Sequence, residues 1–234
     1  EKRRLVGELR ALEDRPQTPS DDAQGIPSDT QISLDVAAPV HGGGFELIVA
    51  TSNETYVVGA VVLDTDGGLF DGETLSCAPA RPSDKLGIIV RPKKNFPASL
   101  KLQIHVAARP MSTSIHVFEV DYKLPKFCRF YRVADEVSTP SSWVKFDVPT
   151  NVQRVAQYLT QAFVSTEAVE TEDNQVKAYY VGLDGSPLRV EATKDTTGTQ
   201  VRVSTNDLAT AAEVVQDIAT SLDVHELESE ASFP

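Results

Sequence analysis

The sequence predicts a protein of two modules, an immunoglobulin-like β-sandwich followed by a smaller α+β module. Short runs rich in Val, Ile and aromatic residues recur from about residue 31 to residue 132, with turn residues between them. Every clear helical pattern of the globular region comes after residue 133. Between the two patterns an alternating run ends in Leu124-Pro125-Lys126-Phe127, which marks the seam between the modules.

Residues 1–15 predict the end of an amphipathic or coiled-coil helix, because Leu5, Leu9 and Leu12 recur at helical spacing among mixed charges. Residues 16–30 are rich in Pro, Ser and Asp, which is the composition of a flexible linker. Globular structure is therefore expected from about residue 31. Residue 1 is Glu and no signal-peptide segment is present, so we expect the chain to be a piece of a longer protein.

Six strands are expected in the first module, and six or seven over about a hundred residues suit an immunoglobulin-like sandwich. Alternation is plainest where Leu102, Ile104 and Val106 are expected to face inward. The intervening His105 is then expected on the solvent side. The expected strands cover residues 32–36, 45–50, 56–63, 86–91, 100–108 and 114–122.

The second module is expected to follow the order β-α-β-β-β-α, in which two helices cover one face of an antiparallel sheet. Thr150 and Gln153 have the spacing of a capping box, which starts a helix directly after the first strand. The last helix is expected to begin near Asn206 or Asp207. Expected strands cover residues 143–148, 176–183, 188–193 and 201–204, and the expected apolar helix faces comprise Val152, Val155, Ala156, Leu159, Phe163, Leu208, Ala211, Val215, Ile218 and Leu222.

Charge is distributed unevenly along the 234 residues, whose net charge is −12. Residues 1–80 carry 5 basic and 14 acidic side chains, residues 81–132 carry 11 and 3, and residues 133–234 carry 6 and 17. A basic centre between acidic flanks can steer a partner, although a solvated surface also explains such runs. No apolar run approaches the roughly 20 residues of a membrane helix. Cys77 and Cys128 are too few for a disulfide framework and favour a reducing compartment.

The sequence contains no recognisable catalytic motif, so we expect neither an enzyme nor a cofactor. The four histidines are scattered and lack Cys or His neighbours at metal-ligand spacing, which argues against zinc. Residues 64–68 imitate the start of a calcium loop, but the twelfth position is Leu75, where a bidentate Glu is needed. A hairpin turn is the better interpretation of residues 64–68.

Two surface features are candidates for partner binding. A basic set comprises Arg91, Lys93, Lys94, Lys101, Lys123, Lys126 and Arg129. It is expected to meet an acidic protein surface or anionic lipid headgroups, unless it only blunts an edge strand. Trp143 is the single Trp, and it either packs in the core or helps to grip a peptide. Nucleic-acid binding is not expected of a chain this acidic.

Three segments carry a resemblance to a known family. The order of helix end, sandwich and α+β module is similar to the ear and platform of clathrin-adaptor appendages. Residues 59–73, 115–130 and 214–234 more specifically resemble the BBSome subunits among the Bardet-Biedl syndrome proteins. The most distinctive pieces are Phe-Asp-Gly-Glu at 70–73, His-Val-Phe-Glu at 116–119 and Glu-Ala-Ser-Phe-Pro at 230–234.

The resemblance implies a scaffold of a coat-like complex that moves membrane proteins into and out of cilia. It implies a coiled-coil end at 1–15, a linker at 16–30, an ear at 31–132 and a platform at 133–234. The coiled coil would pair with a paralogue, Bardet-Biedl syndrome protein 7, and the complex would contact the ciliary membrane peripherally. Alternatives are an appendage-like receptor for short linear peptides and an extracellular glycan-binding sandwich. Pro125 is expected to set how the ear meets the platform, since it restricts Leu124 to extended backbone.

Overall fold

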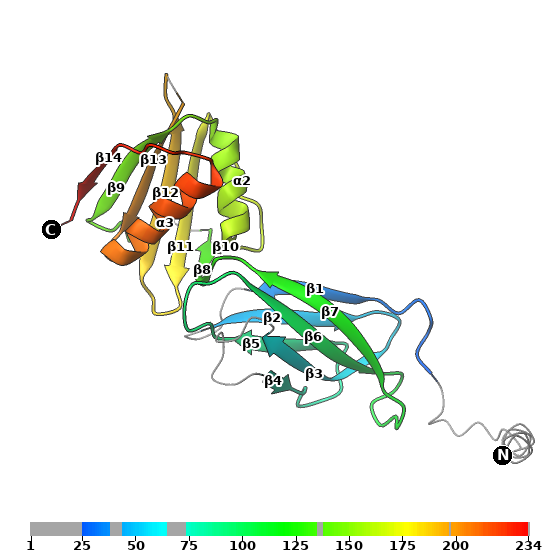
Figure 1. Ribbon diagram of the computed structural model, residues 1–234. Coiled ribbons are helices and arrows are strands. Elements are labelled where there is room, and N and C mark those ends of the chain that lie inside the picture. The colour runs from blue at the N-terminus through cyan, green and yellow to red at the C-terminus, as the bar shows by residue number, and fades with distance from the viewer. Residues whose placement is uncertain (1–24, 38–43, 65–73, 135–137, 197, 234) are drawn as a thin grey trace, which may run out of the picture.

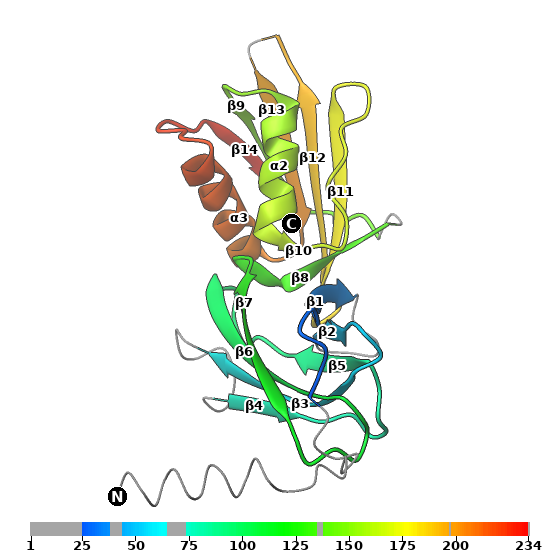
Figure 2. The ribbon, with the colours of Figure 1, turned by 90° about the vertical axis from the view of Figure 1, so that its right-hand side faces the viewer.

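The computed structural model describes residues 25–37, 44–64, 74–134, 138–196 and 198–233, and these form two layered units stacked end to end (Figures 1 and 2). We call the described residues up to Leu124 the ear and those from Phe127 onward the platform. The expected coiled-coil end at 1–15, residues 16–24 of the expected linker and most of the calcium-like loop at 64–68 lie outside the described residues.

The ear is a sandwich of two antiparallel sheets, as predicted. One sheet has the order β1-β2-β5 and the other β4-β3-β6-β7. Leu102, Ile104 and Val106 all face the core and are fully buried, whereas His105 on the opposite side is half-buried. The strands are β1 (Ile32–Ala37), β2 (Phe45–Thr51), β3 (Tyr56–Asp64), β4 (Thr74–Cys77), β5 (Lys85–Val90), β6 (Ala98–Ala107) and β7 (His116–Leu124).

All six expected ear strands are present, but β4 was not predicted. It has four residues, and its two inward positions, Leu75 and Cys77, are only half-buried. Two apolar positions separated by one Ser are too short a pattern to distinguish a strand from a loop. β4 forms because it pairs along β3, a tertiary contact that the local sequence does not encode.

The platform is a seven-stranded sheet of order β10-β8-β11-β12-β13-β9-β14, with both helices on one face (Figure 2). All its pairs are antiparallel except β10 with β8, which is parallel. A single core lies between sheet and helices. The elements are β8 (Phe127–Val133), β9 (Trp143–Val148), α2 (Val152–Ala162), β10 (Phe163–Val164), β11 (Gln175–Gly182), β12 (Pro187–Lys194), β13 (Thr199–Thr205), α3 (Leu208–Ser221) and β14 (Ser229–Ser232).

The start of α2 corrects the expected capping box. Asn151, not Thr150, is the N-cap, and its side-chain oxygen accepts the backbone N–H of Arg154 at 2.9 Å. Asn caps helices at least as well as Thr. At position 151, one residue after Thr150, its side chain reaches the backbone N–H of the third helical residue, Arg154. The carbonyl of Thr150 instead accepts the hydroxyl of Thr199 at 2.6 Å, which ties this turn to β13.

α3 begins where it was expected, after the N-cap Asp207, whose carboxylate accepts the backbone N–H groups of Ala209 and Thr210. Leu208 was expected in the apolar face, yet it is 61% exposed. It occupies the first helical position beside the cap, and the buried stripe begins one turn later at Ala211. Tyr158, Ala162 and Val214 are also buried, although they lie outside the expected apolar faces of the two helices.

The predicted boundary at 132/133 falls inside β8. This strand pairs with β11 and thereby belongs to the platform sheet. Its sequence, FCRFYRV, is rich in aromatic residues, as strands of either unit can be, but its burial does not alternate strictly, so its sheet cannot be recognised locally. We propose that the boundary lies at the connection between Leu124 and Phe127.

Candidate functional site

The joint between ear and platform is a connection of two residues, Pro125 and Lys126, between buried anchors. Leu124 ends β7 and belongs to the ear core, and Phe127 begins β8 and belongs to the platform core. These anchors are 3% and 0% exposed. Three further sets of contacts surround this connection.

The first set is an aromatic stack within the platform, directly behind the joint. The ring of Phe163 on β10 lies between Phe127 and Tyr180, with centroids 4.7 and 4.1 Å away and planes inclined by 16° and 24°. Such pairs contribute about 0.5–1.5 kcal/mol each beyond the burial of their area. Burial raises the pKa of Tyr180, whose hydroxyl has no hydrogen-bond partner among the described residues. The stack therefore acts mainly through packing.

The second set joins β8 to the ear loop at residues 91–97. The thiol of Cys128 donates to the carbonyl oxygens of Lys94 at 3.4 Å and Phe96 at 3.7 Å. The backbone N–H of Arg129 donates to the side-chain oxygen of Asn95 at 3.2 Å. Burial raises the pKa of the Cys128 thiol, which is 1% exposed and remains a protonated donor. Successive residues of β8 are thus bonded to one ear loop.

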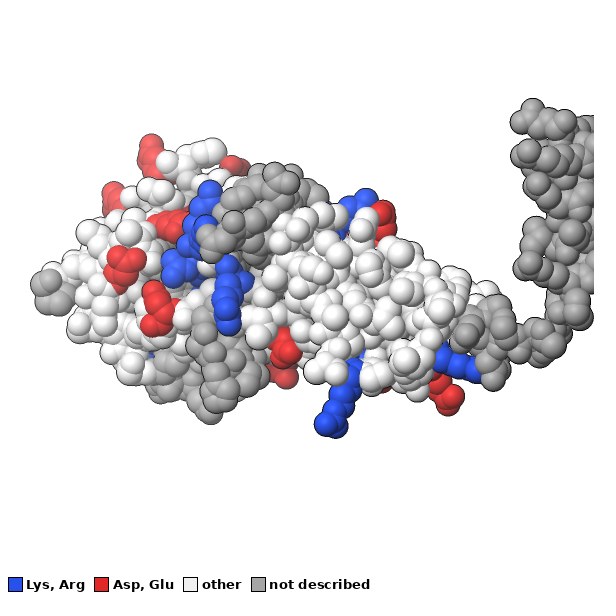
Figure 3. Space-filling model, turned by 90° about the horizontal axis from the view of Figure 1, so that it is seen from below, with Lys and Arg blue, Asp and Glu red and all other residues white. Residues whose placement is uncertain are grey.

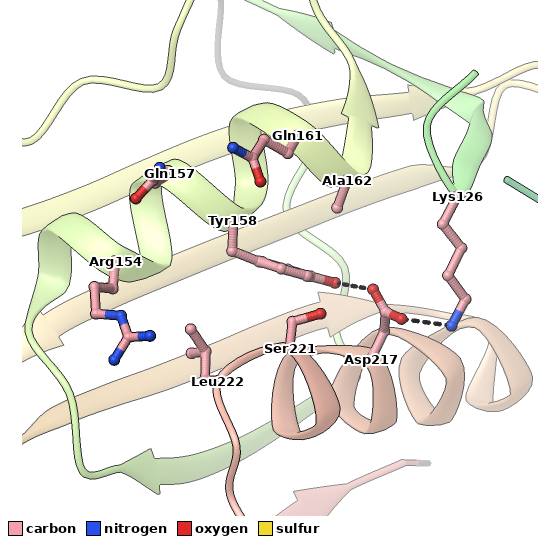
Figure 4. A pocket seen from close by; sticks show the side chains of 9 residues that line it. All are labelled: Lys126, Arg154, Gln157, Tyr158, Gln161, Ala162, Asp217, Ser221 and Leu222. Atoms are coloured by element: carbon pink, nitrogen blue, oxygen red, sulfur yellow. Dashed lines mark hydrogen bonds and ion pairs between the residues drawn. The ribbon is translucent and has the colours of Figure 1, made fainter. Parts of the chain in front are cut away.

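The third set centres on Asp217 of α3. One of its carboxylate oxygens lies 2.6 Å from Nζ of Lys126, and the other accepts the hydroxyl of Tyr158 on α2 at 2.7 Å (Figure 4). Burial, as the larger cause, and the neighbouring Asp217 carboxylate, as the smaller one, raise the pKa of Tyr158 far above its ordinary range. The Tyr158 hydroxyl therefore stays protonated and donates its hydrogen bond. One carboxylate therefore ties both helices to the residue that leaves the ear.

Beside this network lies a groove between the two helices, with a cavity volume of about 370 Å³. Figure 4 shows Lys126 and Asp217 at one end and Arg154 at the other. α2 contributes one wall and α3 the other. The groove is lined by Lys126, Arg154, Gln157, Tyr158, Gln161, Ala162, Asp217, Ser221 and Leu222.

Among the residues that the structure describes, ion pairs hold Lys101, Lys126 and Arg129 of the predicted basic set. Lys126 pairs with Asp217 at 2.6 Å. Lys101 pairs with Glu119 at 2.9 Å, and Arg129 lies 3.8 Å from Asp184. Only the pair of Lys126 is substantially shielded from solvent, whereas the pairs of Lys101 and Arg129 are exposed and contribute little to stability.

The remaining members of the set are exposed. Lys94 lies over the ring of Phe96, with Nζ 5.2 Å from the centroid. Arg91, Lys93 and Lys123 are exposed as well, and Lys93 has an interaction of its own. Figure 3 shows lysine and arginine side chains gathered in one region of the lower face. Since the set spans the loop at 91–97, β6, β7 and β8, its members do not all belong to one site.

Trp143 lies outside the core. Val144, Phe146 and Val148 of β9 are buried under the helices, so the alternating positions face the other side of the sheet. There Trp143 is half-buried, and the guanidinium carbon of Arg202 is 4.7 Å from its ring centroid. The structure places Trp143 far from the groove, on the face that the helices leave uncovered.

Sequence reasoning missed Tyr158 and Asp217, the residues that organise the groove. They lie 59 positions apart on different helices, and neither forms a motif with its neighbours. The available signal was weak: Tyr158 adjoins the expected apolar stripe of α2, where a buried hydroxyl needs a partner.

Comparisons with known proteins match both units. Residues 39–127 match the model of the BBS2 GAE domain, and residues 130–222 match that of the BBS2 platform domain. The BBSome complex member BBS2 of Mus musculus is 29% identical over 249 aligned residues, covering 100% of this chain and 34% of the relative. That of Homo sapiens is 28% identical with the same coverage, and bbs-2 of Caenorhabditis elegans is 23% identical over 89% of this chain and 30% of its own length. The chain spans about a third of the length of these relatives.

Proposed function

The chain belongs to the BBS2 family and carries its GAE and platform domains, and on this premise we propose that the two domains form a non-enzymatic scaffold by which the protein joins other BBSome subunits. The relatives are named as members of a complex rather than as enzymes. Among the described residues, no group of three or more His, Cys, Asp or Glu could hold a metal ion. None of the helices in the described ranges is long and apolar enough to cross a membrane.

The observation that carries the proposal is the joint. The Asp217 network bonds the residue leaving the ear to both platform helices, and Cys128 and Arg129 bond the first platform strand to an ear loop. Contacts on several elements fix an orientation better than a two-residue connection does. A unit of fixed shape can present both domains to neighbouring subunits without a large ordering cost.

The partners that we propose are other BBSome subunits, notably the paralogue Bardet-Biedl syndrome protein 7 through a coiled coil that includes residues 1–15. The family resemblance and the leucine spacing of this segment support this pairing. The complex would work in the cytoplasm and at the cilium and basal body, carrying membrane proteins with peripheral membrane contact. Nucleic acid is not among the proposed partners.

The test is co-expression of the tagged 234-residue chain with candidate BBSome subunits, followed by affinity capture. A matched variant lacks residues 1–24 and keeps all the described residues of both domains. We expect the intact chain to capture several subunits, and the shortened chain to lose the paralogue selectively. Capture of no subunit by a chain that still unfolds cooperatively on heating would refute the scaffold role. Equal capture of the paralogue by both forms would refute the coiled-coil pairing alone.

A further inference from the structure

Polar side chains in the groove between α2 and α3 divide into two groups. Lys126, Tyr158 and Asp217 bond one another. The side chains of Arg154, Gln157, Gln161 and Ser221 make no hydrogen bond or ion pair with any residue that the structure describes. One side of the cavity therefore retains its full hydrogen-bonding capacity.

The charges of the lining leave one cation uncompensated. The groove is lined by Lys126, Arg154 and the single carboxylate of Asp217, which lies 2.6 Å from Lys126. Nearby carboxylates are those of Glu213, one turn before Asp217, and Asp223, just after Leu222, and neither lines the cavity. Arg154 is thus the charge available to an incoming group, and its planar guanidinium suits a carboxylate.

The spacing along α2 suits an extended chain. Arg154, Gln157 and Gln161 follow the i, i+3, i+7 pattern of one helix face, as Figure 4 shows. At about 1.5 Å per residue they extend over roughly 10 Å. An extended peptide rises about 3.3 Å per residue, so this length matches three or four residues. A volume of about 370 Å³ is also in the range of ligand sites.

The carboxamides indicate what kind of chain would lie there. Each Gln side chain offers both donors and an acceptor, as a peptide main chain does. A helix satisfies its own main chain and would leave these groups unused, and its apolar face would not match polar walls. An anionic membrane surface calls for several clustered cations, whereas here Arg154 stands alone.

We propose that this groove binds an extended acidic segment of a partner protein. A carboxylate of the segment pairs with Arg154, and its main-chain amides bond Gln157 and Gln161. The site requires only the folded platform. Failure to capture BBSome subunits would therefore not contradict peptide binding in the groove. Loss of peptide binding would likewise not contradict the scaffold role.

The test is a nuclear magnetic resonance titration of the isotope-labelled chain with acetyl-Gly-Asp-Ala-Asp-Gly-amide. The matched probe has Asn in place of both Asp residues. We expect saturable shifts of the Arg154 guanidinium and of the Gln157 and Gln161 carboxamides, with the Asn probe binding at least several-fold more weakly. R154Q should weaken binding of the Asp probe about tenfold, the loss expected for a charge-assisted hydrogen bond.

The control variant is R202Q, which removes one positive charge from the opposite face of the sheet. It should bind the Asp probe as the unmodified chain does. Equal binding of both probes, equal binding by R154Q, or shifts confined to another face would overturn the proposal. So would displacement of the peptide by anionic phosphatidylserine vesicles at matched charge, since the groove would then serve a lipid surface.

Discussion

Lys126 and Asp217 are 91 residues apart and form an ion pair of 2.6 Å, the contact by which the connection leaving the ear is held to the last helix of the platform. The side chain of Asp217 is 16% exposed and that of Lys126 35%. The pair is therefore only partly screened by solvent, unlike an ordinary surface ion pair.

Replacing Asp217 with Asn should destabilise the platform. Lys126 would lose its counter-charge in a half-buried position, while the Tyr158 hydroxyl keeps a possible acceptor. Allowing for solvent screening, we expect a loss of about 1–2 kcal/mol in the free energy of unfolding. Urea denaturation followed by tryptophan fluorescence measures it. The control K101Q breaks the exposed pair with Glu119 and should leave the urea midpoint unchanged. Equal effects of the two variants would contradict a stabilising role of the Lys126–Asp217 pair.

Truncating the middle ring of the aromatic stack should have a larger effect. Phe163 is 2% exposed and lies between Phe127 and Tyr180. Its replacement by Ala should cost about 3–5 kcal/mol through lost burial and a residual cavity. L208A, at the exposed first position of α3, should change stability by less than about 0.5 kcal/mol. A mild effect of F163A would show that the platform core can collapse around the missing ring.

Pro125 is not expected to control the orientation of the two units by itself. The sequence assigns it that role, but Lys126 is bonded to α3, and Cys128 and Arg129 are bonded to the ear loop at 91–97, so several contacts besides Pro125 hold the two units. P125G should therefore leave the small-angle scattering profile unchanged. A profile that broadens for P125G, with both units still folded, would restore the role that the sequence suggests.

The cap of α3 should make stability depend on pH. Hydrogen bonds from Thr210, supported by the backbone N–H of Ala209, lower the pKa of Asp207 below its ordinary value of 3.8. A carboxyl with a lowered folded pKa stabilises above its unfolded pKa, and the stabilisation is lost as pH falls through the folded value. At pH 7, D207A should be less stable by about 1 kcal/mol. The difference should shrink below pH 3.8, and D207N, which keeps a capping oxygen, should stay close to the unmodified chain.

The two cysteines should differ in reactivity. Burial raises the pKa of both thiols, but Cys128 is fully buried and bonded to the loop at 91–97, whereas Cys77 is half-buried on the short strand β4. An aromatic disulfide reagent should modify Cys77 first and Cys128 only at the rate of unfolding. C77S should then show a single slow phase. Fast modification of Cys128 in that variant would mean that the joint opens readily.

Elements whose signals are local could be predicted from the sequence. The alternation around Ile104 and the cap at Asp207 each encode their own structure within a few residues. Hence the fold class and six ear strands were correct. The same local signals could not show that β8 joins the platform, since the aromatic-rich segment FCRFYRV suits a strand of either sheet and only its pairing with β11 decides between them.

The candidate site was less accessible to sequence reasoning. Basic residues such as Lys126 could be recognised as a set, but whether a lysine faces solvent or a carboxylate depends on folding partners up to 91 residues away. The face on which Trp143 lies depends on which side of β9 the helices cover. The groove requires α2 and α3 to be adjacent, and neither helix sequence contains that information.

β8 directly follows the ear in the chain, yet its antiparallel partner β11 begins only at Gln175. As the chain leaves the ribosome, the ear can therefore finish folding while Phe127 and Phe130, both buried in the native protein, have no sheet to join. During part of synthesis, the folded ear is thus followed by a segment whose aromatic side chains are not yet buried and can associate with other chains. Substitutions that destabilise β8 or β11 should therefore first increase the aggregation of newly made chains. The molecules that do fold should still bind their partners.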